Sequence, residues 1–132
     1  MKFIADLHIH SRYSRATSPG MVIPSLSRAA RMKGIRLVAT GDFTHPEWLE
    51  SLKRDLTPCG NGLFQRDETY FILSAEVNNA SHRRGKFHQI HNLLYVPSFD
   101  AAEKVNGYLG RYGTLTSDGR PTLKLEDRKS VV

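Results

Sequence analysis

Apolar stretches alternate with polar ones along this chain in a way that predicts four short strands. They lie at residues 2–8, 35–40, 70–77 and 87–96. Each has the length of a strand, and together they are rich in Val, Ile, Leu, Phe and Tyr, with polar segments or turn residues at their ends. The first is expected to be a buried strand that ends in polar residues.

Three helices are predicted between and after these strands. Residues 24–33 and 46–56 each begin with a proline, which is favoured in the first helical turn, and Gly34 is a good C-cap for the first. A third helix is expected over residues 100–110, capped by Ser98 or Asp100. Alternation of strands and helices favours an α/β fold built from parallel units.

The segments between these elements are predicted to be irregular. Residues 11–20 and 57–68 are expected to be loops, residues 78–86 a polar turn, and the last twenty residues lack periodicity. Within the helix over residues 24–33, the spacing predicts an inner face and a solvated basic face. The inner residues are Leu26, Ala29 and Ala30, and the solvated ones are Arg28, Arg31 and Lys33.

Composition narrows the class of protein. The 132 residues suffice for one domain, taken here as residues 1–132, and contain no apolar run of the roughly 20 residues that a membrane span needs. The N-terminus lacks the layout of a signal peptide, and Cys59 is the only cysteine, so we expect a cytoplasmic protein. The net charge of +6 is compatible with a nucleic-acid partner and equally with simple solubility.

Histidines and carboxylates lie near the ends of the predicted strands. They are Asp6, His8 and His10 at the first strand, Asp42 after the second, Glu76 near the end of the third, and His88 and His91 at the start of the fourth. In a parallel α/β fold such ends meet at one rim. Imidazoles and carboxylates together suit zinc or manganese. A single histidine is more often a core residue, and a buried Glu76 could instead pair with Arg or Lys.

Three short motifs resemble the polymerase-and-histidinol-phosphatase (PHP) family. They are residues 6–11 (Asp-Leu-His-Ile-His-Ser), residues 41–42 (Gly-Asp) and residues 74–77 (Ser-Ala-Glu-Val). The resemblance implies part of a distorted (β/α)7 barrel, with only its N-terminal strands and helices, and a metal-dependent phosphoesterase. Asp42 stands where many members have a histidine ligand, so Asp42, His45 or both are candidates to reach a metal.

Four further motifs look like one branch, the endonuclease Q family of DNA repair enzymes. They are residues 8–18, 40–46, 91–94 and 117–121, and the likeness runs from residue 2 to about residue 128. It implies zinc or manganese as cofactor and DNA as partner. The implied metal ligands are His8, His10, Asp42, Glu76 and His91, with Asp42 and Glu76 also catalytic. The implied contacts with DNA phosphates are Arg12, Arg15, Arg83, Arg84 and Lys86, whereas His88 has no clear counterpart.

Two features of that family are missing from the sequence. No Asp-x-His pair follows His91, and one cysteine cannot supply the family's downstream zinc-binding segment. We therefore expect an N-terminal portion of the barrel: either the chain is a fragment or a truncated reading frame, or the remainder lies on another chain. The function expected is metal-dependent hydrolysis of DNA at deaminated or damaged bases, incomplete in this chain. The alternatives are a phosphatase of small phosphate esters and a non-catalytic metal-binding or DNA-binding remnant.

Overall fold

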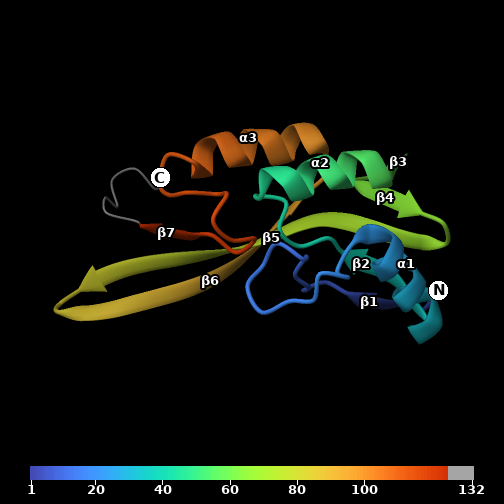
Figure 1. Ribbon diagram of the computed structural model, residues 1–132, viewed down its shortest axis with the longest axis horizontal. Coiled ribbons are helices and arrows are strands. Elements are labelled where there is room, and N and C mark those ends of the chain that lie inside the picture. Colours follow the sequence, from blue (N-terminus) through green and yellow to red (C-terminus); the bar gives the residue numbers. More distant parts are fainter. Residues whose placement is uncertain (125–132) are drawn as a thin grey trace.

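The computed structural model describes residues 1–124, apart from the side chain of Arg83, as a curled mixed sheet with helices packed along it (Figure 1). The helices are α1 (Ile23–Lys33), α2 (Pro46–Asp55) and α3 (Phe99–Leu109). The strands are β1 (Ile4–Asp6), β2 (Ile35–Ala39), β3 (Thr57–Gly60), β4 (Leu63–Arg66), β5 (Thr69–Arg83), β6 (Lys86–Val96) and β7 (Thr122–Lys124). This is an α/β half-barrel, as predicted.

The sheet is organised around the long strand β5. Its order is β1-β2-β5-β4-β3, and β6 and β7 also pair with β5. The first half of β5 lies parallel to β2, which in turn lies parallel to β1, as the α/β prediction requires. The second half carries β6 antiparallel and β7 parallel. One strand therefore connects the compact body to an extended arm formed by β5 and β6 (Figure 1).

Helix α1 begins one residue before the predicted limit and ends where predicted, but its inner face is rotated from the one expected. Gly34 adopts a left-handed φ of 73° and caps the helix through its N–H. The buried residues are Ile23, Ser27 and Ala30, and Ala29 is exposed, contrary to expectation. Ser27 can face inward because its hydroxyl bonds to Thr69 Oγ1 at 3.2 Å. Leu26 is partly buried against the core, and the three basic residues of the helix are exposed as predicted.

Residues 57–68, expected to be a loop, instead form the hairpin of β3 and β4. Asn61 and Gly62 have φ of 57° and 77°, which is the left-handed pair that a two-residue hairpin turn requires. Pro58 lies on β3, the last strand of the sheet path, where a missing N–H is tolerated. Proline and glycine are typical both of loops and of irregular edge strands. Their presence in residues 57–68 therefore led to the wrong prediction of a loop.

The polar turn expected over residues 78–86 is also wrong. Strand β5 continues to Arg83, and the turn consists of Arg84 and Gly85, with φ of 51° and 74°. A turn of two residues can join only antiparallel strands. The fourth predicted strand, observed as β6, is therefore antiparallel rather than parallel.

The first strand is shorter and more exposed than predicted. Only Ile4–Asp6 pairs in the sheet, as an edge strand whose three residues are all exposed, and His8 and His10 follow it in irregular chain. The core lies deeper, around the fully buried Phe43, Trp48 and Phe71. Within residues 1–124, no helix is both long and apolar enough to cross a membrane.

Candidate metal centre

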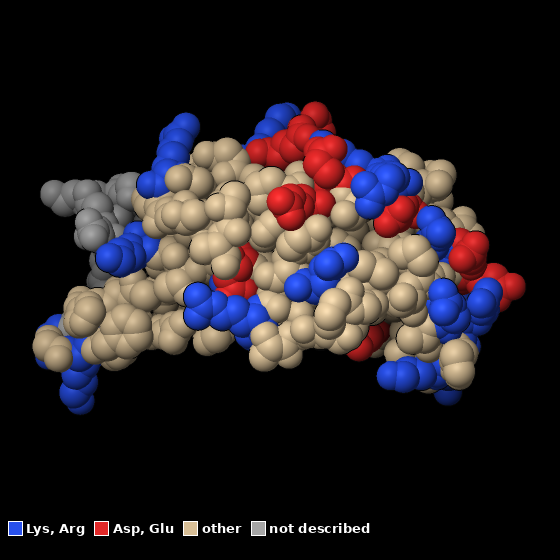
Figure 2. Space-filling view, viewed as in Figure 1, with Lys and Arg blue, Asp and Glu red and all other residues tan. Residues whose placement is uncertain are grey.

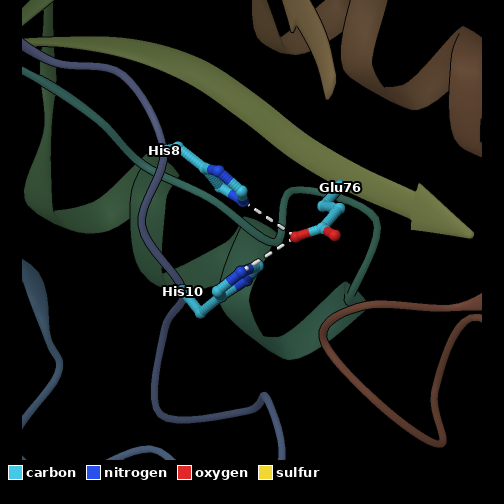
Figure 3. Close-up of side chains that lie close together, drawn as sticks. All are labelled: His8, His10 and Glu76. Carbon is cyan, nitrogen blue, oxygen red and sulfur yellow. Dashed lines mark hydrogen bonds and ion pairs between the residues drawn. The ribbon is translucent and has the colours of Figure 1, made fainter. Parts of the chain in front are cut away.

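Three histidines surround one buried carboxylate. Glu76 is only 5% exposed, and its Oε2 lies 2.8 Å from His8 Nε2 and 2.9 Å from His10 Nε2 (Figure 3). Its other oxygen, Oε1, lies 2.6 Å from His91 Nδ1. The two oxygens of Glu76 thus face different imidazoles. The ligand atoms of His8, His10 and Glu76 all lie within 4.8 Å of one another, a spacing that one metal ion can span.

The register of the arm brings His91 to this cluster. In the antiparallel pairing, Glu76 lies opposite Leu93 and Asn78 lies opposite His91. Leu93 lies opposite Glu76, so these two side chains share one face of the sheet. His91 is two residues from Leu93 on the same strand, so its side chain points to that face as well. Sequence reasoning predicted that His91 would approach from the beginning of a parallel strand. It approaches instead from the middle of an antiparallel one.

The histidines also determine the charge state of Glu76. Burial by itself raises the pKa of this carboxyl, whereas hydrogen bonds with His8 and His91, together with the charge of His10, lower it. The opposing contributions leave the pKa of Glu76 below its ordinary value. Glu76 is therefore an ionised carboxylate at neutral pH, which is the form that binds metal ions.

Asp42 contacts the cluster from behind His10. It is fully buried, and its Oδ1 lies 3.3 Å from His10 Nδ1, the ring nitrogen that faces away from Glu76. Its Oδ2 accepts hydrogen bonds from Ser11 N at 2.7 Å, Ser11 Oγ at 2.5 Å and Ser14 Oγ at 2.9 Å. The backbone of Asp42 is in the left-handed region, with φ of 54°. The structure thus brings together all five predicted ligand residues, with Asp42 in contact with an imidazole.

His45 and His88, the two histidines whose metal binding the sequence left open, make no hydrogen bond or ion pair with Glu76 within the described residues. His45 is the N-cap of α2, where its Nδ1 accepts the Glu47 N–H at 3.2 Å, and its ring stacks on Tyr13 at 4.4 Å between centroids. His88 is exposed and lies opposite Ser81, three residues nearer the tip of the arm than His91. His45 therefore caps a helix and stacks on a tyrosine, whereas His88 is an exposed residue of the arm.

The predicted DNA contacts fall in two places. Arg84 and Lys86 are exposed at the tip of the arm, and the side chain of Arg83 lies outside the described residues. Arg12 and Arg15 are exposed in the loop that follows His10. Arg12 lies over the ring of Tyr13 at 5.8 Å, and Arg15 Nε is 3.5 Å from Asp118 Oδ2.

Several residues of the site had no role in the sequence-based prediction. Ser11 and Ser14 hold Asp42, and Tyr95 donates to the carbonyl of Leu7 at 2.7 Å, so it ties the arm to the segment that carries His8. Gly119 packs against Asp42 from a distant part of the chain. The two serines follow His10 within four residues, which was the available signal. Nothing in the sequence connects Gly119 or Tyr95 with these partners.

The fold and the site together define an α/β half-barrel with a histidine–carboxylate cluster. Among solved structures, it resembles PfuEndoQ, the lesion-specific endonuclease of Pyrococcus furiosus, with a TM-score of 0.81 and 37% identity over 92% of this chain. A structure of endonuclease Q with a 27-mer duplex substrate, which has an abasic lesion at the active site, matches with a TM-score of 0.80 and 37% identity over 92% of this chain. The likeness confirms the predicted half-barrel fold.

The similarity covers only part of each relative. The chain spans 29% of each endonuclease Q chain. It is also 30% identical over 121 residues, or 91% of its length, to the uncharacterized protein MJ0043 of Methanocaldococcus jannaschii, of which it spans 13%. No protein-family model matches the chain, so membership of the PHP family stays a prediction.

Proposed function

We propose that this chain forms part of a metal-dependent DNA repair endonuclease, which hydrolyses a phosphodiester at deaminated or damaged bases. One observation carries the proposal: a buried, ionised Glu76 divides its two oxygens between His8 and His10 on one side and His91 on the other. The likeness to a lesion-specific endonuclease supports DNA as the substrate.

The side chains present fit zinc or manganese. Imidazole nitrogens and carboxylate oxygens are ordinary ligands of both ions, and a carboxylate with both oxygens available suits a bridging role. We assign His8, His10, Glu76 and His91 as the residues that hold metal. When bound, such ions lower the pKa of a coordinated water and stabilise charge on a phosphate oxygen.

The chain's own residues prepare this centre. The negative charge of Glu76 offsets the positive charge that metal ions bring to a partly buried site. Tyr95 and β6 keep His8 and His91 beside it, so little ordering of side chains remains to be done when metal binds. Arg12 and Arg15 lie on the loop directly after His10, where they can attract a phosphate backbone toward the cluster.

The arm of β5 and β6 supplies a second basic surface. No Asp or Glu occurs anywhere in residues 77–99, whereas Arg84 and Lys86 lie at its tip. Figure 2 shows basic and no acidic side chains at the outer end of this arm, on the face in view. The eight residue-to-residue steps from Glu76 to Arg84 span about 26 Å in extended chain, or about eight base pairs at 3.4 Å each. The arm is therefore long enough to contact DNA well beyond the cleaved bond.

DNA binding is expected to weaken steeply with salt, and the tip of the arm should account for part of that dependence. Changing Arg84 and Lys86 together to Gln removes two phosphate contacts, which should reduce the slope of log affinity against log salt by about two. Fluorescence anisotropy with a labelled duplex at several salt concentrations measures this slope. The matched control changes Arg28 and Arg31, which are exposed on α1, to Gln. Equal slopes for the two variants would contradict a role for the arm.

Catalysis is tested in a hybrid protein. Residues 1–124 replace the matching segment of the Pyrococcus furiosus endonuclease, so that the part of that protein which this chain does not span is present. We expect the hybrid to nick duplexes with a deaminated base or an abasic site when manganese or zinc is added, and to stop when a chelator is added. Hydrolysis of small phosphate esters without cleavage of DNA would favour the phosphatase alternative. A folded, metal-loaded hybrid that hydrolyses neither substrate would favour the non-catalytic alternative.

A further inference from the structure

The oxygen atoms of Asp42 are not interchangeable. Its Oδ2 accepts the backbone N–H of Ser11 as well as two hydroxyl groups, and a backbone N–H can only donate. Whatever atom lies at the Oδ2 position must therefore be an acceptor. These donors hold the carboxylate with Oδ2 toward the two serines, so Oδ1 faces His10 Nδ1 at 3.3 Å.

This arrangement determines which nitrogen of His10 is available to a metal. A neutral imidazole has one N–H and one lone pair. In the metal-free chain both ring nitrogens of His10 face a carboxylate oxygen, Nδ1 that of Asp42 and Nε2 that of Glu76. When a metal takes the lone pair of Nε2, the proton is on Nδ1, where Asp42 Oδ1 accepts it. Nε2 lies 2.9 Å from Glu76 Oε2 within the cluster, so it is the ring nitrogen that a metal held beside Glu76 would meet. A carboxylate behind a metal-binding histidine performs this function in many metal sites.

A segment from the far end of the described chain closes over Asp42. A Cβ added to Gly119 would lie 2.6 Å from both Asp42 Cγ and Ser14 Oγ, so no larger residue fits without displacing them. Gly119 is held in place because its N–H donates to the carbonyl of Tyr13 at 3.0 Å. Asp118 also accepts the Arg15 N–H at 3.3 Å. The carboxylate therefore has little freedom to rotate toward the cluster.

We infer that Asp42 is a positioning residue, which holds His10 with its proton on Nδ1 and is itself held by Ser11, Ser14 and Gly119. This inference rests on the proposed metal site. It gives Asp42 a role other than the direct ligand suggested by the sequence. It also explains why a buried carboxylate, which would be costly without partners, lies beside an imidazole and two serines.

The test is the variant Asp42→Asn in the full 132-residue chain. The Ser11 N–H requires the amide oxygen at the Oδ2 position, so the amide NH₂ must face His10 Nδ1 and turn that nitrogen into an acceptor. The proton then moves to Nε2, where it blocks the metal. We expect zinc affinity, measured by competition with a chelating dye, to fall by about 10- to 100-fold. In the zinc-loaded chain, the ¹⁵N shifts of the His10 ring should show a protonated Nδ1 and a metal-bound Nε2, and Asp42→Asn should change this tautomer.

Gly119→Ala is the second variant, and Gly107→Ala is its control. Gly107 lies on α3, where an added Cβ meets nothing within 4 Å, so zinc affinity should stay unchanged there and fall for Gly119→Ala. Unchanged affinity and an unchanged His10 tautomer in Asp42→Asn would overturn the inference. A wild-type chain that binds neither zinc nor manganese would reject the proposed metal site itself. Loss of affinity with the His10 tautomer unchanged would show that Asp42 is a direct ligand.

Discussion

Replacing Glu76 with Gln is expected to lower zinc or manganese affinity by at least about 100-fold, or about 2.8 kcal/mol. Gln keeps the size of the side chain but removes the negative charge and replaces one acceptor oxygen with an NH₂ donor. Since each Glu76 oxygen faces a different set of imidazoles, one of the two sets must then face that donor. Calorimetric titration of the metal-free chain measures the change.

The control for this variant is Glu68→Gln. Glu68 is an exposed carboxylate just before β5, and its loss should leave metal affinity unchanged. In the hybrid protein, Glu76→Gln should also abolish cleavage of damaged DNA. Undiminished metal binding by Glu76→Gln would show that the cluster is only a hydrogen-bonded network of three histidines and a glutamate.

The chain by itself is expected to cleave damaged DNA at least about 100-fold more slowly than the hybrid, because loss of one charge-stabilising group commonly costs about 100- to 1000-fold. Two four-coordinate ions have about eight coordination positions. The described cluster offers three imidazole nitrogens and two carboxylate oxygens. One ion can therefore be held, while a complete two-metal centre lacks protein ligands.

The measurement compares nicking by both proteins at equal concentration in manganese and in zinc. Metal binding by the chain is the control, because a chain that binds no metal would be inactive for a different reason. Comparable rates of specific cleavage by the chain and the hybrid would contradict this prediction. They would mean that residues 1–132 contain the full catalytic set.

The sequence by itself was sufficient for features that depend on neighbouring residues. Pro46 and Gly34 mark helix ends through their own backbone preferences, and α1, α2 and α3 begin and end close to the predicted limits. The set of His8, His10, Glu76 and His91 was predicted through the motifs that resemble endonuclease Q. The structure brings these side chains together, and their binding of metal stays a prediction.

Features that depend on pairing between distant residues required the tertiary structure. The apolar pattern gives β6 but not its direction, which a turn of only Arg84 and Gly85 decides. The surroundings of Asp42 depend on Gly119, which is 77 positions away along the chain. Sequence shows that a carboxylate is present, but burial and the donors around it decide what it does. For Asp42 those donors are Ser11, Ser14 and His10, and only the folded chain brings them together.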